Sequence, residues 1–296
     1  MTNGEKQIVD NVQLPRPIPV WPFVLILLLL VGVSYLTRKP QPADLELERS
    51  SEYSHIRIRK KGSVRTLIFV RDNGKEVVES RMDMDRPHEL QLPYSQAMFA
   101  SHFYLPQPKR VLIVGLGAGS MVRFLQHHQP ELKIDAVDID PVVVEIAEAY
   151  FGTRSGEGTN IITADAFVFL KETKHKYDVI YMDAFLKPAV DTDQSGVPQR
   201  LKTIEFFRSI QAKLTAQGLV VFNLNINDNT PQDIETIEQA FVAMHVFTCA
   251  SKNLAVVALR QKVDVSDQGL RKTAQALDAR FKANFSFEEL LKQRRD

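Results

Sequence analysis

The stretch that decides the fold is VLIVGLGAGSM, from Val111 to Met121. It starts with apolar, mostly β-branched residues, as a buried strand does, and then places Gly115, Gly117 and Gly119 at every second position before a helix-like segment. Glycine has no side chain and tolerates positive φ, so such a turn lets the backbone approach a ligand closely. The stretch therefore predicts a strand, a ligand-binding turn and a helix, in that order.

Strand-like and helix-like segments alternate after this turn. The expected strands are the apolar runs RVLIVG, KIDAVDI, NIITAD, YDVIYMD and GLVVFNLN. Segments with helical patterning, such as PVVVEIAEAYF and TIEFFRSIQAKL, lie between most of them, which favours a doubly wound parallel sheet. HVFTCAS and LAVVALR follow, separated only by Lys252 and Asn253, so an antiparallel pair is expected there. Residues 93–262 are thus predicted to form an α/β domain with a mainly parallel, seven-stranded sheet and an antiparallel last strand.

Two further regions flank this domain. Residues 51–92 contain three short β-like runs, and Asn73-Gly74 between the last two is a strong hairpin signal. They predict a small antiparallel β domain. Residues 263–296 are polar and helix-prone, and are expected to form a helical tail.

The N-terminal region contains the most apolar segment of the chain. Residues 20–36, VWPFVLILLLLVGVSYL, carry no charge, and their length is at the short end of the roughly 17 to 25 residues that span a bilayer. A cleavable signal peptide is the alternative, but residues 1–19 have no compact basic region and no small-residue cleavage site follows the run. We therefore expect an N-terminal tail over 1–19, a transmembrane helix over 20–36 and a linker over 37–50. The basic flanks favour an inner or plasma membrane protein with its C-terminal part in the cytoplasm.

Composition limits the classes of partner. The formal net charge of +1 gives no general attraction to nucleic acid, and no nucleic-acid partner is expected. Cys249 is the only cysteine, which excludes an intrachain disulfide. No metal cofactor is expected.

Aspartates follow three of the predicted strands. Ligands of open α/β sheets bind beyond the carboxyl ends of the strands, where Asp138, Asp165 and Asp183 would line one edge, although an aspartate there can also be a helix N-cap. Asp138 follows Gly119 by 19 residues, close to the ~20-residue spacing of an acid that binds ribose hydroxyls. Ser120 stands where a dinucleotide fingerprint needs glycine, and the turn has no P-loop lysine. The pattern indicates a nucleoside ligand.

These features together resemble the S-adenosylmethionine-binding fold and, more narrowly, the spermidine synthase (polyamine aminopropyltransferase) family. The segments that carry the resemblance are, in order, SEYSHIRI, PKRVLIVGLGAGSM, VDIDPVVVEIAEAYF, ADAFVFL, YDVIYMDAF and PQRLKTIEFF, over roughly residues 51–260. The resemblance implies S-adenosylmethionine or its decarboxylated form as co-substrate, a small amine as acceptor, and a homodimer.

The resemblance also implies roles for single residues. The cofactor-binding residues would be Gly115, Gly117, Gly119, Asp138, Asp165 and Ala166, the substrate-binding residues Tyr94 and Gln96, and the catalytic residue Asp183. In this interpretation the glycine turn faces the methionine part of the cofactor, Asp138 the ribose, and Asp165 with Ala166 the adenine. Asp183 would accept the proton of the attacking amine, which must be neutral to act as a nucleophile.

The chain departs from the family pattern at several positions. Ala118 stands where the glycine turn usually has an aspartate, Leu186 where a second acid follows the catalytic one, and Ser95 and Gln96 replace the His-Glu of a Tyr-His-Glu segment. Aminopropyl transfer to a polyamine is the first hypothesis. Methyl transfer from S-adenosylmethionine and a non-catalytic, membrane-tethered nucleoside-binding protein are the alternatives.

Overall fold

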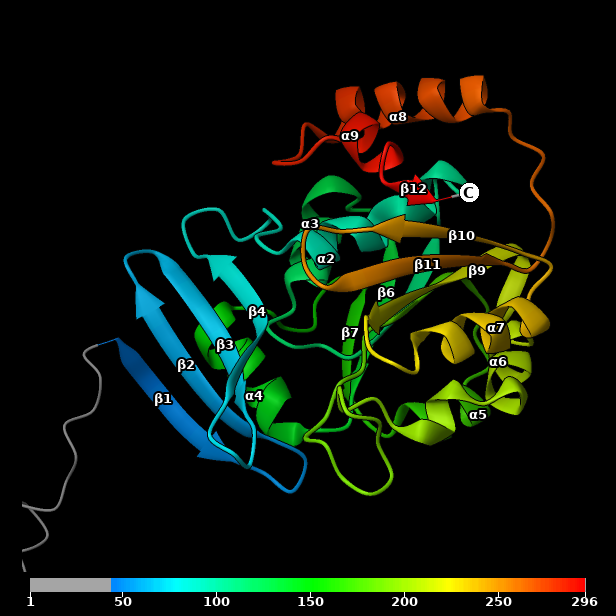
Figure 1. Ribbon diagram of the computed structural model, residues 1–296. Helices are drawn as coiled ribbons and strands as arrows, with labels where there is room; N and C mark the ends of the chain where they lie inside the picture. Colours follow the sequence, from blue (N-terminus) through cyan, green and yellow to red (C-terminus); the bar gives the residue numbers. More distant parts are fainter. Residues whose placement is uncertain (1–43, 296) are drawn as a thin grey trace, which may run out of the picture. The chain divides into compact units, whose positions relative to one another are not determined.

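The structure, a computed structural model, describes residues 44–295 and contains two β-sheets (Figure 1). The first sheet is antiparallel, with neighbouring strands in sequence order. Its strands are β1 (Leu45–Ser50), β2 (His55–Lys61), β3 (Val64–Val70) and β4 (Glu76–Asp83). Gly74 has a φ of 78° in the β3–β4 turn, which confirms the hairpin predicted from Asn73-Gly74.

Strand β1 corrects the predicted linker. Residues 45–50 were expected to lie in a linker over 37–50, but they pair with β2 as an edge strand. Their side chains alternate between half-buried and exposed, and the strand is rich in charged residues. Such a sequence has little hydrophobic signal of its own, and its strand conformation depends on the hydrogen bonds that β2 offers.

The second sheet follows the glycine turn along the chain. Its strand order is β12-β10-β11-β9-β8-β5-β6-β7. The strands are β5 (Arg110–Val114), β6 (Lys133–Asp138), β7 (Thr159–Thr163), β8 (Tyr177–Met182), β9 (Leu214–Asn225), β10 (Ala243–Thr248), β11 (Asn253–Leu259) and β12 (Arg294–Arg295). Strands β5 to β9 are parallel, whereas β11 is antiparallel to both β9 and β10. The mainly parallel sheet and its antiparallel pair are confirmed, with the short β12 added at the edge.

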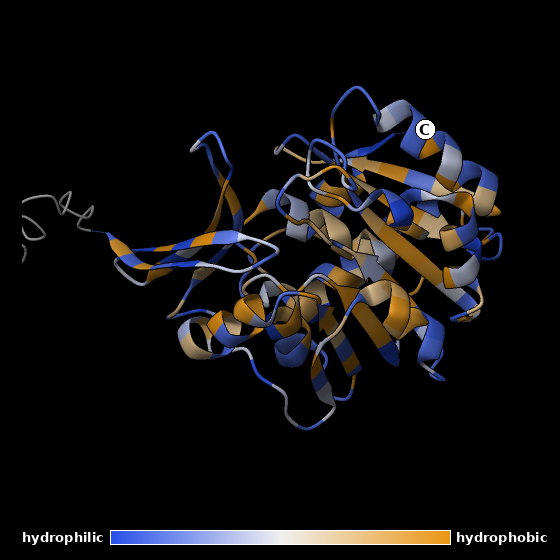
Figure 2. Ribbon diagram, turned by 90° about the horizontal axis from the view of Figure 1, so that it is seen from below, coloured by the Kyte–Doolittle hydropathy of each residue, from blue (hydrophilic) through white to orange (hydrophobic). Residues whose placement is uncertain are grey.

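Helices cover both faces of this sheet. They are α2 (Pro93–Met98), η1 (Phe99–Phe103), α3 (Ser120–His128), α4 (Pro141–Phe151), α5 (Ala166–Glu172), η2 (Gln199–Lys202), α6 (Ile204–Gln211), α7 (Thr230–Ala240), α8 (Asp267–Phe281) and α9 (Phe287–Leu291). One face packs against α2, η1, α3, α4, α8 and α9, and the other against α5, α6 and α7. The strands are the most hydrophobic elements, and the outer helices are more mixed (Figure 2). Asp44–Asp296 form one compact unit, so the predicted boundaries within it stay predictions.

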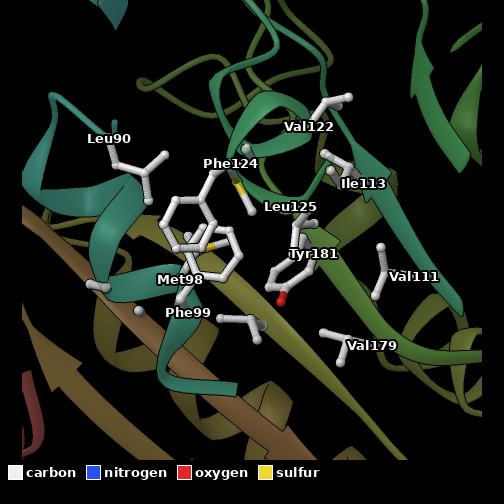
Figure 3. Close-up of a cluster of buried hydrophobic side chains, with 14 of the residues drawn as sticks. Leu90, Met98, Phe99, Val111, Ile113, Val122, Phe124, Leu125, Val179 and Tyr181 are labelled. Atoms are coloured by element: carbon white, nitrogen blue, oxygen red, sulfur yellow. The ribbon is translucent and has the colours of Figure 1, made fainter. Parts of the chain in front are cut away.

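Figure 3 shows part of the core on the first face, around β5 and β8. Val111 and Ile113 of β5 and Tyr181 of β8 pack there with Phe99 and Phe124, and all five side chains are buried. The phenol oxygen of Tyr181 is 2.9 Å from the hydroxyl of Ser101, so this polar atom is hydrogen-bonded inside the core. The packing makes β5 and β8, which carry the site, a rigid base for it.

Gly115 ends β5 where two neighbouring strands also end. Its backbone NH donates to Val137 of β6, and the NH of Asp183 donates to Val114, both over 2.8 Å. Gly115 has a φ of 94°, and a Cβ on it would lie 2.1 Å from the carbonyl oxygen of Asp183. Only glycine therefore allows β5 and β8 to meet at this point.

The expected transmembrane helix over 20–36 lies outside the described residues, as do the tail over 1–19 and the first part of the linker. Among residues 44–295, no helix combines the length and the hydropathy needed to cross a membrane.

Substitution of Gly115 tests the importance of this contact. Gly115→Ala is expected to lower the free energy of unfolding by at least ~3 kcal/mol, from left-handed backbone strain plus overpacking against a carbonyl group. Gly62→Ala is the matched control, because Gly62 has a φ of 61° and open space around its Cβ position, and should cost only about 1 kcal/mol. Urea unfolding of the two variants measures both values, and equal losses would contradict the close-contact explanation.

Candidate active site

A cavity of about 190 Å³ lies at the carboxyl ends of the parallel strands, between the two sheets. The glycine turn, β4, α2, β9 and the residues at the ends of β6 and β8 all contribute to its wall. Polar side chains on its wall include those of Glu79, Ser80, Tyr94, Asp138, Asp183 and Asn223. The site is therefore formed by segments that lie far apart in the sequence.

Asp138 lines this cavity with both of its carboxylate oxygens held in place. The backbone NH of Leu116 donates to Oδ2 over 2.8 Å, and that of Asp140 donates to Oδ1 over 2.9 Å. Burial raises the pKa of Asp138 to about 6, although these two NH groups act in the opposite direction. Asp140, not Asp138, caps α4 by accepting from Val142. The capping alternative thus does not apply to Asp138, whose remaining lone pairs are available to ribose hydroxyls.

Asp165 and Ala166 lie in a neighbouring cavity with apolar walls. Gly115, Asp138 and Asp165 line it together with Val114, Val137, Ile139, Ala166 and Leu201. Asp165 caps α5, because its Oδ1 accepts from the NH of Phe167, and its Oδ2 is 2.5 Å from Arg200. The helix-cap interpretation therefore holds for Asp165, while its place beside a mainly apolar cavity is the one expected of an adenine contact. Its binding role stays a prediction.

The three glycines differ in position. Gly115 and Gly117 line the main cavity, whereas Gly119 does not. Gly119 caps α3 in the left-handed region, and a Cβ on it would be 2.2 Å from the Thr153 side chain. Its role is thus to let the turn pack on Thr153, whose hydroxyl donates to the carbonyl of Ala118 over 2.9 Å.

Asp183 faces the main cavity from the end of β8. Its Oδ1 accepts a 2.7 Å hydrogen bond from Nδ2 of Asn223 on β9. Burial raises the pKa of Asp183 to about 7, the amide of Asn223 lowers it, and the nearby carboxyl of Asp138 raises it. A carboxyl group that titrates near neutral pH is suited to accept a proton from a bound nucleophile.

The two predicted substrate residues on α2 point in different directions. Tyr94 lines the cavity, and its hydroxyl donates to the backbone carbonyl of Glu79 over 2.8 Å. Gln96 does not line it, and its side-chain amide donates to the carbonyl of Leu90 over 2.7 Å. The structure brings Tyr94 to the site and holds Gln96 against the preceding loop.

Three comparisons place this geometry among known proteins. A model of the spermine/spermidine synthase domain matches residues 94–259. A polyamine aminopropyltransferase of Chromobacterium violaceum is 32% identical over 244 residues, which cover 80% of this chain and 89% of that protein. The chain belongs to the spermine/spermidine synthase family.

Solved structures agree with this assignment at the level of the fold. The spermidine synthase of Thermotoga maritima superposes with a TM-score of 0.61 at 16% identity, over 84% of this chain and 83% of that one. Human methyltransferase-like protein 13, solved in complex with SAH, gives a TM-score of 0.57 at 25% identity, over 65% of this chain and 91% of that one. The fold expected from the sequence, a methyltransferase-like sheet preceded by a small antiparallel one, is thus confirmed for the described residues.

Glu79 is a site residue that the sequence pattern did not reveal. In the pairing of β3 with β4, Leu67 faces Ser80 and Ile68 faces Val78, so Glu79 is the unpaired residue of a β-bulge. The bulge brings Glu79 to the cavity wall, and burial raises the pKa of its carboxyl to about 7. A bulge follows from strand pairing, which the residues of β4 alone do not specify. The turn that lacks the family's usual acid at Ala118 thus has a carboxyl group across the cavity.

Ser80 and Ser120 supply hydroxyl groups near the turn. The hydroxyl of Ser80 accepts from the NH of Ala118 over 3.1 Å, and a Cβ on Gly117 would lie 2.5 Å from it. Ser120 Oγ is buried and has no hydrogen-bond partner within the described part of the chain. Because buried hydroxyls are normally paired, this group is available to a bound ligand. Among residues 44–295, no cluster of three or more His, Cys, Asp or Glu could hold a metal ion.

The raised pKa of Asp183 predicts a pH-dependent effect on stability. Between pH 4 and 7 the folded chain binds a proton at Asp183 that the unfolded chain releases, so this group lowers stability as pH rises through that range. Asp183→Asn removes this effect, and is expected to raise the free energy of unfolding by ~4 kcal/mol at pH 8 and by about half as much at pH 5.

Chemical denaturation at both pH values measures this difference. Asp264→Asn is the control, because Asp264 is exposed and lies away from the cavity, and it should change stability equally little at both. If Asp183→Asn changes the free energy of unfolding by the same amount at both pH values, the raised pKa of Asp183 is contradicted.

Proposed function

We propose that this protein is a polyamine aminopropyltransferase, which transfers the aminopropyl group of decarboxylated S-adenosylmethionine to an amine. The observation that carries the proposal is the acidity of the cavity beside the glycine turn. Glu79, Asp138, Asp140 and Asp183 line it against one basic side chain, that of Arg81. Both substrates of the reaction are cationic, and such a cavity attracts cations. Family membership supports the same reaction.

The residues fit a simple displacement. The neutral nitrogen of the amine attacks the methylene carbon next to the sulfonium, a C–N bond forms, and the C–S bond breaks. Its electron pair stays on sulfur and leaves neutral methylthioadenosine. Asp183, whose carboxyl group has a pKa of about 7, accepts the proton that the amine loses before its nitrogen attacks. Asp138 and the glycine turn hold the nucleoside, so that the reacting carbon is positioned beside Asp183.

Glu79 favours the decarboxylated form of the cofactor. Both molecules carry an ammonium group at this end, but S-adenosylmethionine also carries a carboxylate beside it, which the decarboxylated form lacks. Glu79 lies next to Ser80, the residue that contacts the turn at Ala118, so its carboxyl group lies near the turn that holds this end of the cofactor. An ammonium group would be stabilised by Glu79, and a carboxylate would be repelled by it.

Methyl transfer is less well supported by the same feature. Methyl transfer needs the carboxylated cofactor, whose carboxylate would enter a cavity that already holds Glu79 and Asp183. A non-catalytic nucleoside-binding role does not account for the near-neutral pKa of Asp183, so this alternative is also less well supported.

Calorimetry with the full chain in detergent tests the proposal. Decarboxylated S-adenosylmethionine is expected to bind at least tenfold more tightly than S-adenosylmethionine, and addition of a diamine or polyamine should yield methylthioadenosine. Preference for the carboxylated cofactor would point to methyl transfer. If none of the nucleosides binds, the proposal fails.

Glu79→Gln provides the matched variant. It keeps the size of the side chain and removes its charge, so it is expected to weaken binding of the decarboxylated cofactor about tenfold, the effect of ~1.4 kcal/mol. Methylthioadenosine, which has no amino group at that end, should bind the variant and the parent equally. A similar loss for both ligands would show that Glu79 supports the turn and does not discriminate between cofactors.

Membrane attachment and assembly are further parts of the proposal. The uncharged run over 20–36 supports a single-pass anchor in the inner or plasma membrane, with the enzyme domain in the cytoplasm. Fractionation of cells that make the full chain or a chain without residues 1–40 tests it, and a full-length protein found only in the soluble fraction would contradict it. The homodimer stays a prediction for sedimentation analysis.

A further inference from the structure

Three asparagines form a hydrogen-bonded chain that ends on Asp183. Asn223 and Asn225 lie on β9, and Asn253 opens β11 directly opposite Asn225. Nδ2 of Asn253 donates to Oδ1 of Asn223 over 2.9 Å and to Oδ1 of Asn225 over 2.7 Å. Nδ2 of Asn223 then donates to Oδ1 of Asp183 over 2.7 Å. The four side chains line the cavity together.

The direction of this chain is determined by its chemistry. An amide NH₂ group has two protons, and Asn253 uses both of them on two carbonyl oxygens. Oδ1 of Asn223 is therefore an acceptor on that side, and its nitrogen must face Asp183. If the Asn223 amide alone were reversed, its oxygen would face the carboxyl oxygen of Asp183, and no proton would lie between these two acceptors. Its NH₂ group would face the NH₂ group of Asn253, and the protons of the two groups would clash.

We infer that Asn253 is a positioning residue for the transfer reaction: it holds the Asn223 amide with its nitrogen toward Asp183, which leaves Oδ2 of Asp183 to accept the proton of the amine. No hydrogen bond to Oδ2 is formed within residues 44–295, and this oxygen belongs to a side chain on the cavity wall. The inference rests on the proposed function, because it assigns a part in the same reaction. It adds a residue that does not touch the reacting atoms.

The charge state of Asp183 is coupled to the direction of the chain. An ionised carboxylate only accepts hydrogen bonds, so it requires the nitrogen of Asn223. If the chain ran in the opposite direction, the oxygen of Asn223 would face Asp183, and that carboxyl group would have to keep its proton in order to donate. A residue that fixes the direction thus favours the form of Asp183 that acts as a base.

Other groups act on Asp183 from several elements. The titratable and charged side chains that face it or line its cavity are Glu79 and Arg81 on β4, Tyr94 on α2, Asp138 at the end of β6, and Asp140. None of them contacts the asparagine chain through a hydrogen bond in the described part of the protein. A change at Asn253 therefore acts on Asp183 through Asn223.

Asn253→Asp tests the inference because it reverses the direction of the asparagine hydrogen bonds with almost no change in the shape of the side chain. An aspartate accepts hydrogen bonds at both oxygens, so Asn223 would turn its NH₂ group toward it and present its oxygen to Asp183. The acid limb of the pH profile of kcat/KM is expected to move upward by one unit or more from its position near 7, with about tenfold lower activity at pH 7 and recovery above pH 8. Asn253→Ala, which removes the donor without adding a charge, should move the limb less and in the same direction.

Lys252→Glu is the matched control for charge. Lys252 is exposed and adjacent to Asn253, and this variant changes the local charge by more than Asn253→Asp does while it leaves the chain of amides intact. Its acid limb should stay where the parent's is. An unshifted limb in folded Asn253→Asp would overturn the inference, as would an equal shift in Lys252→Glu.

A second measurement needs neither cofactor nor amine. The increase in the free energy of unfolding caused by Asp183→Asn is measured against pH, once in the parent protein and once in the Asn253→Asp variant. The pH above which this increase becomes constant should be higher in the Asn253→Asp background, by the same amount as the shift of the acid limb of kcat/KM. Equal levelling-off in both backgrounds would overturn the inference. If the parent protein shows no turnover, the proposed function fails, but the stability measurement can still be made. The two failures can therefore be told apart.

Discussion

The site depends on the close approach of two backbone segments, at Gly115 and Asp183. A carbonyl oxygen occupies the space that any side chain at position 115 would need, and the same glycine takes a left-handed φ that other residues adopt at a cost. This contact joins the turn that would hold the nucleoside to the strand end that carries the proposed base. Because β5 is paired in parallel with both β6 and β8, the distance between the turn after β5 and the base after β8 is a property of the sheet.

The small N-terminal sheet completes the site from the other side. Its β-bulge carries Glu79 to the cavity, and Ser80 contacts the glycine turn. Arg71, at the end of β3, donates to the carbonyl oxygens of Leu186 and Ser195 in the loop after Asp183. The sheet therefore contributes side chains to the cavity wall as well as covering the cavity. The cavity thus has several carboxyl groups, although Ala118 stands in the glycine turn.

Aspartates at similar positions in the sequence have different roles because their surroundings differ. Asp140 and Asp165 cap helices, which is the ordinary role of an aspartate after a strand. Asp140 also accepts hydrogen bonds from Ser51 and Ser54, and so ties the small sheet to the start of α4. Asp138 and Asp183 cap no helix, and burial holds the pKa of each well above the ordinary value of a carboxyl group. Such shifts are typical of functional sites.

The sequence by itself determined the order of the strands and helices, the antiparallel pair near the end, the glycine turn and the acids beside it. These features are local: apolar runs, helical periodicity and glycine spacing are visible in a few consecutive residues. Only the tertiary structure decided that residues 45–50 form a strand, that Gln96 faces a loop, and that Glu79 and the asparagines around Asp183 belong to the site. A bulge, a cross-strand amide contact and an edge strand each depend on which strands become neighbours, and that choice is made by packing across the whole sheet.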